Sequence, residues 1–254
     1  MSLKINKDNI FFILPESRYS ISSRTDTMMD EDFTLYLKFK ILPEELEIHK
    51  EAFAFSRNGM HSGISFTKVD DNKIIANYSY WFSKKNKNGK YENVCKQVYY
   101  QFLPNELNEF NEYIMVCDNF NDKKIDCYFN GKLIGTMEFG DYEKVSYENT
   151  FYWFGCGNMI GPDEHKHIGD FDFDMAFLLN KAIDKTEIDD VVQNYKTKYT
   201  YELFGGMRKL NFSYPLRKHF AFFLDFNQKT RYKIWDMTFS GNYPQIYIEN
   251  NIYF

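Results

Sequence analysis

The segment DFTLYLKFKI (32–41) decides the fold class, because apolar and polar side chains alternate strictly along it. Its apolar positions are Phe33, Leu35, Leu37, Phe39 and Ile41, and its polar positions are Thr34, Tyr36, Lys38 and Lys40. A period of two residues is typical of a half-buried β-strand. The segment therefore predicts a strand with one face in a hydrophobic core.

Most of the remaining chain repeats this pattern in short runs that end at turn residues. The other predicted strands are KIIANYSYWFS (73–83), VCKQVYYQF (94–102), EYIMVCDNF (112–120), IDCYFNGKLIGTMEF (125–139), TFYWFGCG (150–157), FDFDMAFL (171–178) and QIYIENNIYF (245–254). Asn130-Gly131 predicts a tight hairpin turn, since both positions tolerate positive φ. Aromatic residues make up 19% of the chain, which also favours sheet.

One segment, AIDKTEIDDVVQNYKTKY (182–199), has a helical period instead. Its apolar stripe holds Ile188, Val191, Val192 and Tyr195. Asp184 and Glu187 form a capping box, and Ile183 with Ile188 forms a hydrophobic staple. We therefore predict an all-β, two-sheet antiparallel jelly-roll sandwich with one short helix near 185–198, forming a single domain over 1–254.

Five segments, taken in order, resemble concanavalin A-like and laminin G-like jelly-roll domains over roughly residues 30–245. They are DFTLYLKFKI, IDCYFNGKLIG, FYWFGCGN, HIGDFDFDMAFLLNKAIDKTEIDDVV and FLDFNQKTRYKIWDMTFSGN. The resemblance implies two curved antiparallel sheets, often with a calcium ion and a carbohydrate ligand. Calcium sites at Asp70, Asp71 and Asn72, or at Asp118 and Asn119, rest on this analogy. The scaffold hosts lectins, glycosidases and adhesion modules, so it does not fix function.

Charge and hydropathy exclude some partners. The net charge is −5 and basic residues form no stripe, which argues against duplex nucleic acid. No apolar run is long enough for a membrane span. The start, MSLKINKDN, lacks the apolar core of a signal peptide, and we expect a surface-exposed or virion-associated location if the chain belongs to a longer protein.

The four cysteines are Cys95, Cys117, Cys127 and Cys156. They are too few and too scattered for a disulfide framework. Cys117 and Cys127 flank a predicted hairpin turn at equal distances, so two states remain open. Free buried thiols are favoured over a bridge between the strands.

In GDFDFDMA (169–176), Asp170, Asp172 and Asp174 share one predicted strand face, opposite Phe171, Phe173, Met175, Phe177 and Leu179. Successive carboxylates on one face are about 6.5–7 Å apart, within the range of inverting glycosidases. Family 16 glycoside hydrolases, which share the sandwich, carry Glu at the outer positions of a similar motif. Asp side chains are shorter than Glu, so the carboxyl groups here fall short of the positions at which the catalytic glutamates act. We therefore favour a solvated strand face over hydrolysis of a β-glycan.

Asp163, His165, His167 and Asp170 form a second cluster, in DEHKHIGD (163–170). Two histidines one residue apart on a strand share a face and suit zinc or another borderline metal. The spacing matches no strong zinc signature, however. A polar surface loop is the favoured interpretation, and metal binding is the alternative.

The hairpin 73–102 offers a candidate sugar site. Its non-core face is predicted to hold Asn77, Trp81, Gln97, Tyr99 and Gln101. Aromatic rings stack on sugar C–H groups, and amides exchange hydrogen bonds with hydroxyls. The alternative is a solvent-facing sheet in which cross-strand aromatic pairs only stabilise the hairpin.

These observations favour a non-catalytic carbohydrate-binding or adhesion module with a glycan partner and no enzymatic activity. A glycoside hydrolase using the three aspartates is the first alternative. A structural surface or virion protein, present as an oligomer, is the second.

Overall fold

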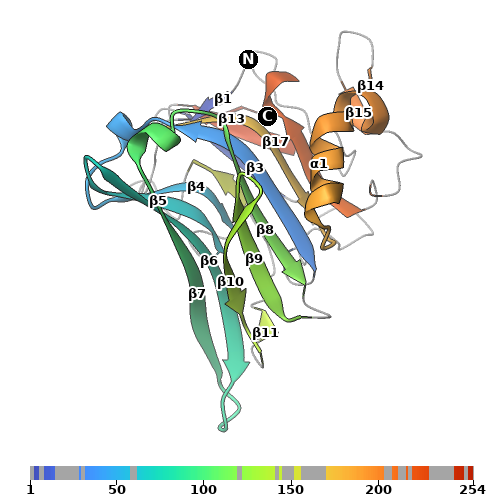
Figure 1. The fold of residues 1–254 in the computed structure, drawn as a ribbon. Coiled ribbons are helices and arrows are strands. Elements are labelled where there is room, and N and C mark those ends of the chain that lie inside the picture. Colours follow the sequence, from blue (N-terminus) through green and yellow to red (C-terminus); the bar gives the residue numbers. More distant parts are fainter. Residues whose placement is uncertain are drawn as a thin grey trace.

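The computed structural model confirms a jelly-roll sandwich of two antiparallel sheets, with one short α-helix among the residues that it describes (Figure 1). The structure describes residues 3–5, 9–14, 29, 32–57, 62–118, 122–140, 143–144, 152–155, 170–202, 208–210, 216, 219–228, 243–248 and 251–253. Within these residues, no helix combines the length and apolarity needed to cross a lipid bilayer.

The first sheet has seven strands in the order β1-β13-β3-β8-β9-β10, with β16 paired to β13. Their bounds are Leu3–Ile5 (β1), Phe33–Ile41 (β3), Asn111–Asp118 (β8), Lys124–Phe129 (β9), Lys132–Glu138 (β10), Phe171–Leu179 (β13) and Phe220–Asp225 (β16). The strand predicted at 32–41 is therefore present and lies between β13 and β8.

The second sheet has nine strands in the order β11-β6-β5-β4-β12-β2-β17-β18, with β7 paired to β6. Their bounds are Asn9–Leu14 (β2), Glu51–Arg57 (β4), Ser62–Asp70 (β5), Lys73–Lys85 (β6), Tyr91–Phe102 (β7), Glu143–Lys144 (β11), Tyr152–Phe154 (β12), Tyr243–Ile248 (β17) and Asn251–Tyr253 (β18). A separate ribbon pairs Thr200–Glu202 (β14) with Arg208–Leu210 (β15). Short 3-10 turns span Pro43–Glu45, Pro104–Glu106 and Phe226–Gln228.

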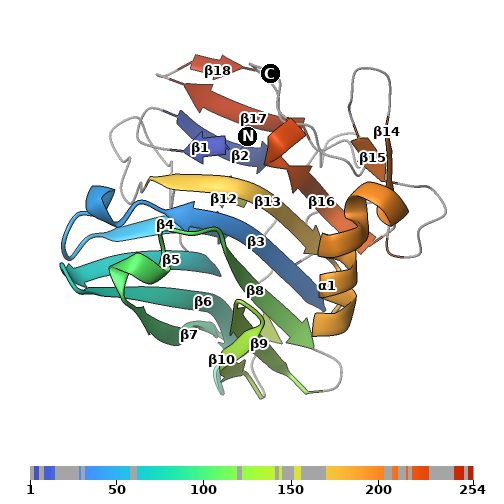
Figure 2. The same ribbon diagram turned by 45° about the horizontal axis from the view of Figure 1, so that its top comes forward.

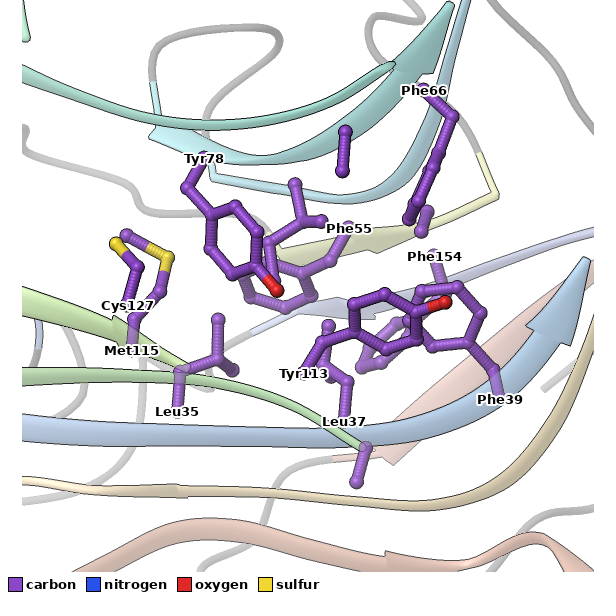
Figure 3. Packing of buried hydrophobic residues seen from close by; sticks show 14 of the residues in the cluster. Leu35, Leu37, Phe39, Phe55, Phe66, Tyr78, Tyr113, Met115, Cys127 and Phe154 are labelled. Carbon is purple, nitrogen blue, oxygen red and sulfur yellow. The ribbon is translucent and has the colours of Figure 1, made fainter. Parts of the chain in front are cut away.

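The hydrophobic core fills the space between the two sheets (Figure 3). Phe39 of β3 stacks on Tyr113 of β8, with ring centroids 4.2 Å apart, and meets Phe66 of β5 edge-on at 5.9 Å. The Tyr78 hydroxyl of β6 donates a 3.1 Å hydrogen bond to the Tyr128 carbonyl of β9. Each buried aromatic ring contributes about 1.5–3 kcal/mol through burial, so these contacts fix one sheet against the other.

The Asn130-Gly131 turn forms as predicted. Both residues have positive φ, 45° and 75°, and Phe129 pairs directly with Lys132 across the turn. The Asn130 side chain accepts a 2.8 Å hydrogen bond from the Glu112 backbone N–H. This bond ties the turn to β8 as well as closing the hairpin.

The predicted alternation along β13 is wrong beyond Phe173. Phe173 pairs with Phe39 and Met175 with Lys38, which leaves Asp174 as the extra residue of a β-bulge. An extra residue moves all following side chains to the opposite face. Phe171, Phe173, Ala176 and Leu178 therefore enter the core between the sheets, whereas Met175, Phe177 and Leu179 point outward.

The outward residues are buried in one cluster with Ile188 and Val191 of α1 (Lys185–Asn194). Figure 2 shows this helix beside the first sheet. Asp184 accepts a 2.8 Å hydrogen bond from the Glu187 N–H, and Glu187 accepts one from the Asp184 N–H, so the predicted capping box is confirmed. Ile183 and Ile188 are both buried in this helix-covered cluster. A π-helical turn, Tyr195–Tyr199, continues the helix. This helix-covered cluster lies over the polar side of β3 and explains why Thr34 and Tyr36 are fully buried.

Cys117 and Cys127 are not joined by a disulfide, so the bridge left open by the sequence is not formed. Cys117 pairs with Ile125, and Cys127 pairs with Met115. The hairpin register therefore places the two cysteines two rungs apart rather than opposite each other. Both side chains are buried in the core.

Candidate functional site

The five predicted sugar-binding residues lie together on the outer face of β6 and β7. The inward residues of these strands are buried in the core: Ile74, Ala76, Tyr78, Tyr80 and Phe82 of β6, and Val98 and Phe102 of β7. Because side chains alternate along a strand, Asn77, Trp81, Gln97, Tyr99 and Gln101 point away from the core. Together with Ile75, Ser79 and Cys95, which share this face, they are called the outer strip.

Strand register sets the neighbours within the outer strip. Asn77 lies opposite Tyr99, Ser79 opposite Gln97, and Trp81 opposite Cys95. Side chains that face each other across an antiparallel pair lie about 4.5–5.5 Å apart at their Cβ atoms. An amide and an aromatic ring are therefore direct neighbours in the middle of the strip.

Exposure decreases from β7 toward the centre of the sheet. The Tyr99 side chain is 60% exposed, and Gln97 and Gln101 are exposed, whereas Asn77 and Trp81 are only partly exposed. On β5, the next strand, Ser65 lies opposite Asn77 and is fully buried. The accessible part of this face is therefore the β6–β7 hairpin rather than the middle of the sheet.

A bulge in β4 shapes the covered part of the face. The β4–β5 register shifts between Phe53 and Phe55. A Cβ atom on Gly63 of β5 would lie 2.0 Å from the Phe55 carbonyl oxygen. Only glycine fits here, so this position serves the sheet and not a ligand.

Two polar groups of this face have informative surroundings. The Asn77 Oδ1 atom is buried and has no hydrogen-bond partner among the described residues. Such an acceptor costs about 1–3 kcal/mol unless a donor reaches it. On β4, the Glu51 carboxylate accepts a 2.5 Å hydrogen bond from the Ser65 hydroxyl. The face therefore combines amides, hydroxyls and one carboxylate.

Cys95 is part of the outer strip and was not among the predicted site residues. Burial, together with the negative charge of Glu51, raises the pKa of its thiol to about 11, although a backbone hydrogen bond at Tyr80 acts in the opposite direction. The thiol is therefore neutral at physiological pH. The sequence signal that places it in the strip is its alternation with Gln97 and Tyr99.

The aspartate row of β13 is engaged in ion pairs. Asp172 lies 3.6 Å from the Lys40 ammonium and Asp174 lies 3.5 Å from that of Lys38, both on β3. Asp174 also accepts a 2.6 Å hydrogen bond from the Asn227 side chain. Asp170 precedes the strand, and its backbone carbonyl accepts a hydrogen bond from the Leu42 N–H. These partners favour a structural role for the row over acid–base chemistry.

The predicted metal cluster cannot be placed as a whole, because Asp163, His165 and His167 lie outside the described residues. Within the described part of the chain, no group of three His, Cys, Asp or Glu residues is arranged to hold a metal ion. At the first calcium position suggested by resemblance, Asp70 caps the Asn72 N–H of its own turn, and Asp71 pairs with Lys68. Both carboxylates are therefore engaged by groups of the turn in which they lie. The second position includes Asn119, which lies outside the described residues.

No family model and no curated protein matches the chain. Solved structures do match. A Bacteroides ovatus protein described as a candidate carbohydrate-binding protein aligns at TM-score 0.53 and 11% identity, over 99% of this chain and 62% of the other. The native heptameric SAP-like pentraxin of Limulus polyphemus (TM-score 0.43, 12% identity, 82% and 94% covered) and the Ruminococcus gnavus IT-sialidase CBM40 (0.43, 12%, 74% and 97%) also match.

The chain spans less than two thirds of the Bacteroides ovatus protein, and the sequence identity with it is low. This similarity therefore shows a shared fold and nothing about ligands. It agrees with the two antiparallel sheets and the short helix α1 described above: the chain has a jelly-roll sandwich fold.

Proposed function

We propose that the protein is a non-catalytic carbohydrate-binding module of the concanavalin A-like and laminin G-like class, and that it binds glycan through the outer strip. The observation that carries the proposal is the pairing of Tyr99 with Asn77, flanked by Gln97 and Gln101. This arrangement sets an exposed aromatic ring beside amides that both donate and accept hydrogen bonds.

The chemistry of the strip suits sugars. The Tyr99 ring offers an apolar face to sugar C–H groups, and its burial by a ligand is favourable. The amides satisfy hydroxyl groups without the cost of desolvating a charge. The side chains stand on strands of a packed sandwich, so little ordering is needed on binding. Affinity per site is weak, and several copies on one surface raise it.

The likeness to the Bacteroides ovatus protein supports this proposal at the level of the scaffold, because that protein is itself described as a candidate carbohydrate binder. The ion pairs of Asp172 and Asp174 weigh against the hydrolase alternative. The outer strip is the surface on which we place the glycan.

A broad glycan array with the purified protein tests the proposal. Trp81→Ala and Tyr99→Ala are the test variants, and Phe110→Ala, an exposed aromatic outside the strip, is the matched control. We expect binding by the native protein and by the control, and loss of binding by both test variants. Unchanged binding in the test variants, or no binding at all, would refute the proposal.

The same array, repeated with a chelator, tests calcium. Binding in both conditions assigns the sugar contacts to the outer strip alone. Binding only with calcium assigns part of the site to a metal, with Asp118 and Asn119, a pair that the resemblance suggests for calcium, as the first residues to substitute.

A further inference from the structure

We infer that the outer strip takes a neutral oligosaccharide of several sugar residues, which lies lengthwise along β6 and β7 and contacts Trp81 and Tyr99 at once. This inference rests on the proposed function and names the class of ligand. It is carried by the separation of the two aromatic residues and by the charges around them.

The separation follows from the register. Tyr99 lies opposite Asn77, and Trp81 is four residues further along the same strand as Asn77, on the same face. At about 3.3 Å per residue, the two aromatic positions are about 13 Å apart along the strand direction. One pyranose ring cannot span this length, whereas a short chain of sugars can.

The interval between the aromatics is lined by hydrogen-bonding groups. Gln97 of β7 is exposed and lies opposite the buried Ser79 of β6, and Asn77 of β6 is partly exposed. The Tyr99 hydroxyl donates to the Gln97 side-chain carbonyl at 2.5 Å, which leaves the Gln97 amide N–H₂ as a donor. A sugar chain crossing this interval therefore meets polar groups between two stacking positions.

The charges near the strip favour an uncharged ligand. None of the eight residues of the strip is an aspartate, glutamate, histidine, lysine or arginine. Glu51, on the same face two strands away, is negative and is held there by Ser65. A carboxylate or sulfate on the ligand would lose hydration without gaining a cationic partner in the strip.

Lys73 and Lys96 lie near the strip but are not part of it. Lys73 begins β6, four residues before Asn77, and is therefore about 13 Å from the central pair. Lys96 alternates with Cys95 and Gln97, so its position belongs to the opposite face of β7. Neither is placed to neutralise an anionic sugar held between Trp81 and Tyr99.

The test is calorimetric titration with neutral gluco- and chito-oligosaccharides, from monosaccharide to hexasaccharide, and with sialyllactose and heparin fragments as anionic probes. We expect no monosaccharide binding, affinity that rises with chain length, and a plateau once both aromatics are covered. Trp81→Ala and Tyr99→Ala should each weaken hexasaccharide binding by about tenfold and flatten the length dependence. Phe110→Ala should change neither.

The outcomes separate the two proposals. Equal affinity for monosaccharide and hexasaccharide, or preference for the anionic probes with loss in Lys73→Gln, would overturn the inference while the carbohydrate-binding function stands. If no probe binds, either in these titrations or on the array, both proposals are overturned. A length-dependent signal that neither aromatic substitution alters would also overturn both, because the sugar would then bind elsewhere.

Discussion

The hydroxyl of Tyr99 donates a 2.5 Å hydrogen bond to the side-chain carbonyl of Gln97, two residues earlier on the same face of β7. The bond restrains a ring that is otherwise 60% exposed, so less rotational freedom is lost when a ligand covers it. It also links the aromatic and amide parts of the outer strip into one unit.

Replacing Tyr99 by Phe separates these two contributions. The ring remains but the hydroxyl and its bond to Gln97 are lost. We expect glycan affinity to fall by about two- to fivefold in Tyr99→Phe and by about tenfold in Tyr99→Ala, as measured by titration. Because the side chain is exposed, stability should change by less than about 0.5 kcal/mol in Tyr99→Phe. An equal loss in both variants would show that the hydroxyl, not the ring, carries binding.

Breaking the Asp174–Lys38 ion pair should lower the stability of the protein only slightly. The two side chains are partly exposed, at 25% and 31%, so Asp174→Asn should lower the free energy of unfolding by less than about 1 kcal/mol. Urea denaturation measures this change. Glycan binding should be unaltered, since Asp174 lies on the other sheet. Turnover of a β-glucan by the native protein, lost in Asp172→Asn and Asp174→Asn, would instead establish the hydrolase alternative.

The N-cap of α1 should contribute measurably to stability. Asp184→Ala removes the acceptor for the Glu187 N–H, and we expect a loss of about 1 kcal/mol. Asp184→Asn is the matched control, because an asparagine cap keeps an acceptor oxygen, and it should retain most of the stability. Chemical denaturation followed by circular dichroism tests both variants. Equal losses would point to the carboxylate charge rather than the hydrogen bond.

The bond between Tyr78 and the Tyr128 carbonyl should stabilise the packing of the two sheets. Tyr78→Phe leaves that carbonyl without this donor inside the sandwich, and we expect a loss of about 1–2 kcal/mol in the free energy of unfolding. Tyr99→Phe is the exposed tyrosine control. A smaller loss for Tyr78→Phe than for this control would contradict the assignment.

The raised pKa of Cys95 predicts slow alkylation. Burial and the charge of Glu51 raise this pKa from 9.0 to about 11, so at pH 9 the native thiol should react about fiftyfold more slowly than the urea-unfolded one. The folded state favours the protonated thiol of Cys95. The stability that this thiol contributes is therefore complete below pH 9 and is lost as the pH rises toward 11. Peptide mapping after iodoacetamide treatment isolates Cys95 from the other cysteines. Native and unfolded rates that agree at pH 9 would contradict the shift.

Local sequence was sufficient wherever neighbouring residues determine the structure. The alternation at 32–41 gave β3, the Asn130-Gly131 pair gave its hairpin, and Asp184 with Glu187 gave the start of α1. Each depends on interactions within a few residues, such as a tolerated positive φ or a side chain that caps its own helix. The members of the outer strip also followed from alternation, because β6 and β7 pair without a bulge.

Tertiary structure decided what depends on pairing between distant segments. The bulge at Asp174 arises where β13 meets β3, and it sends Met175 and Phe177 under α1 instead of into the core predicted for them. The register of β8 against β9 separates Cys117 from Cys127. Burial of Ser65 confines the accessible face to β6 and β7. A period of two residues fixes which side chains share a face only while pairing is regular, and only the packed sheets determine where it is not and what covers each face.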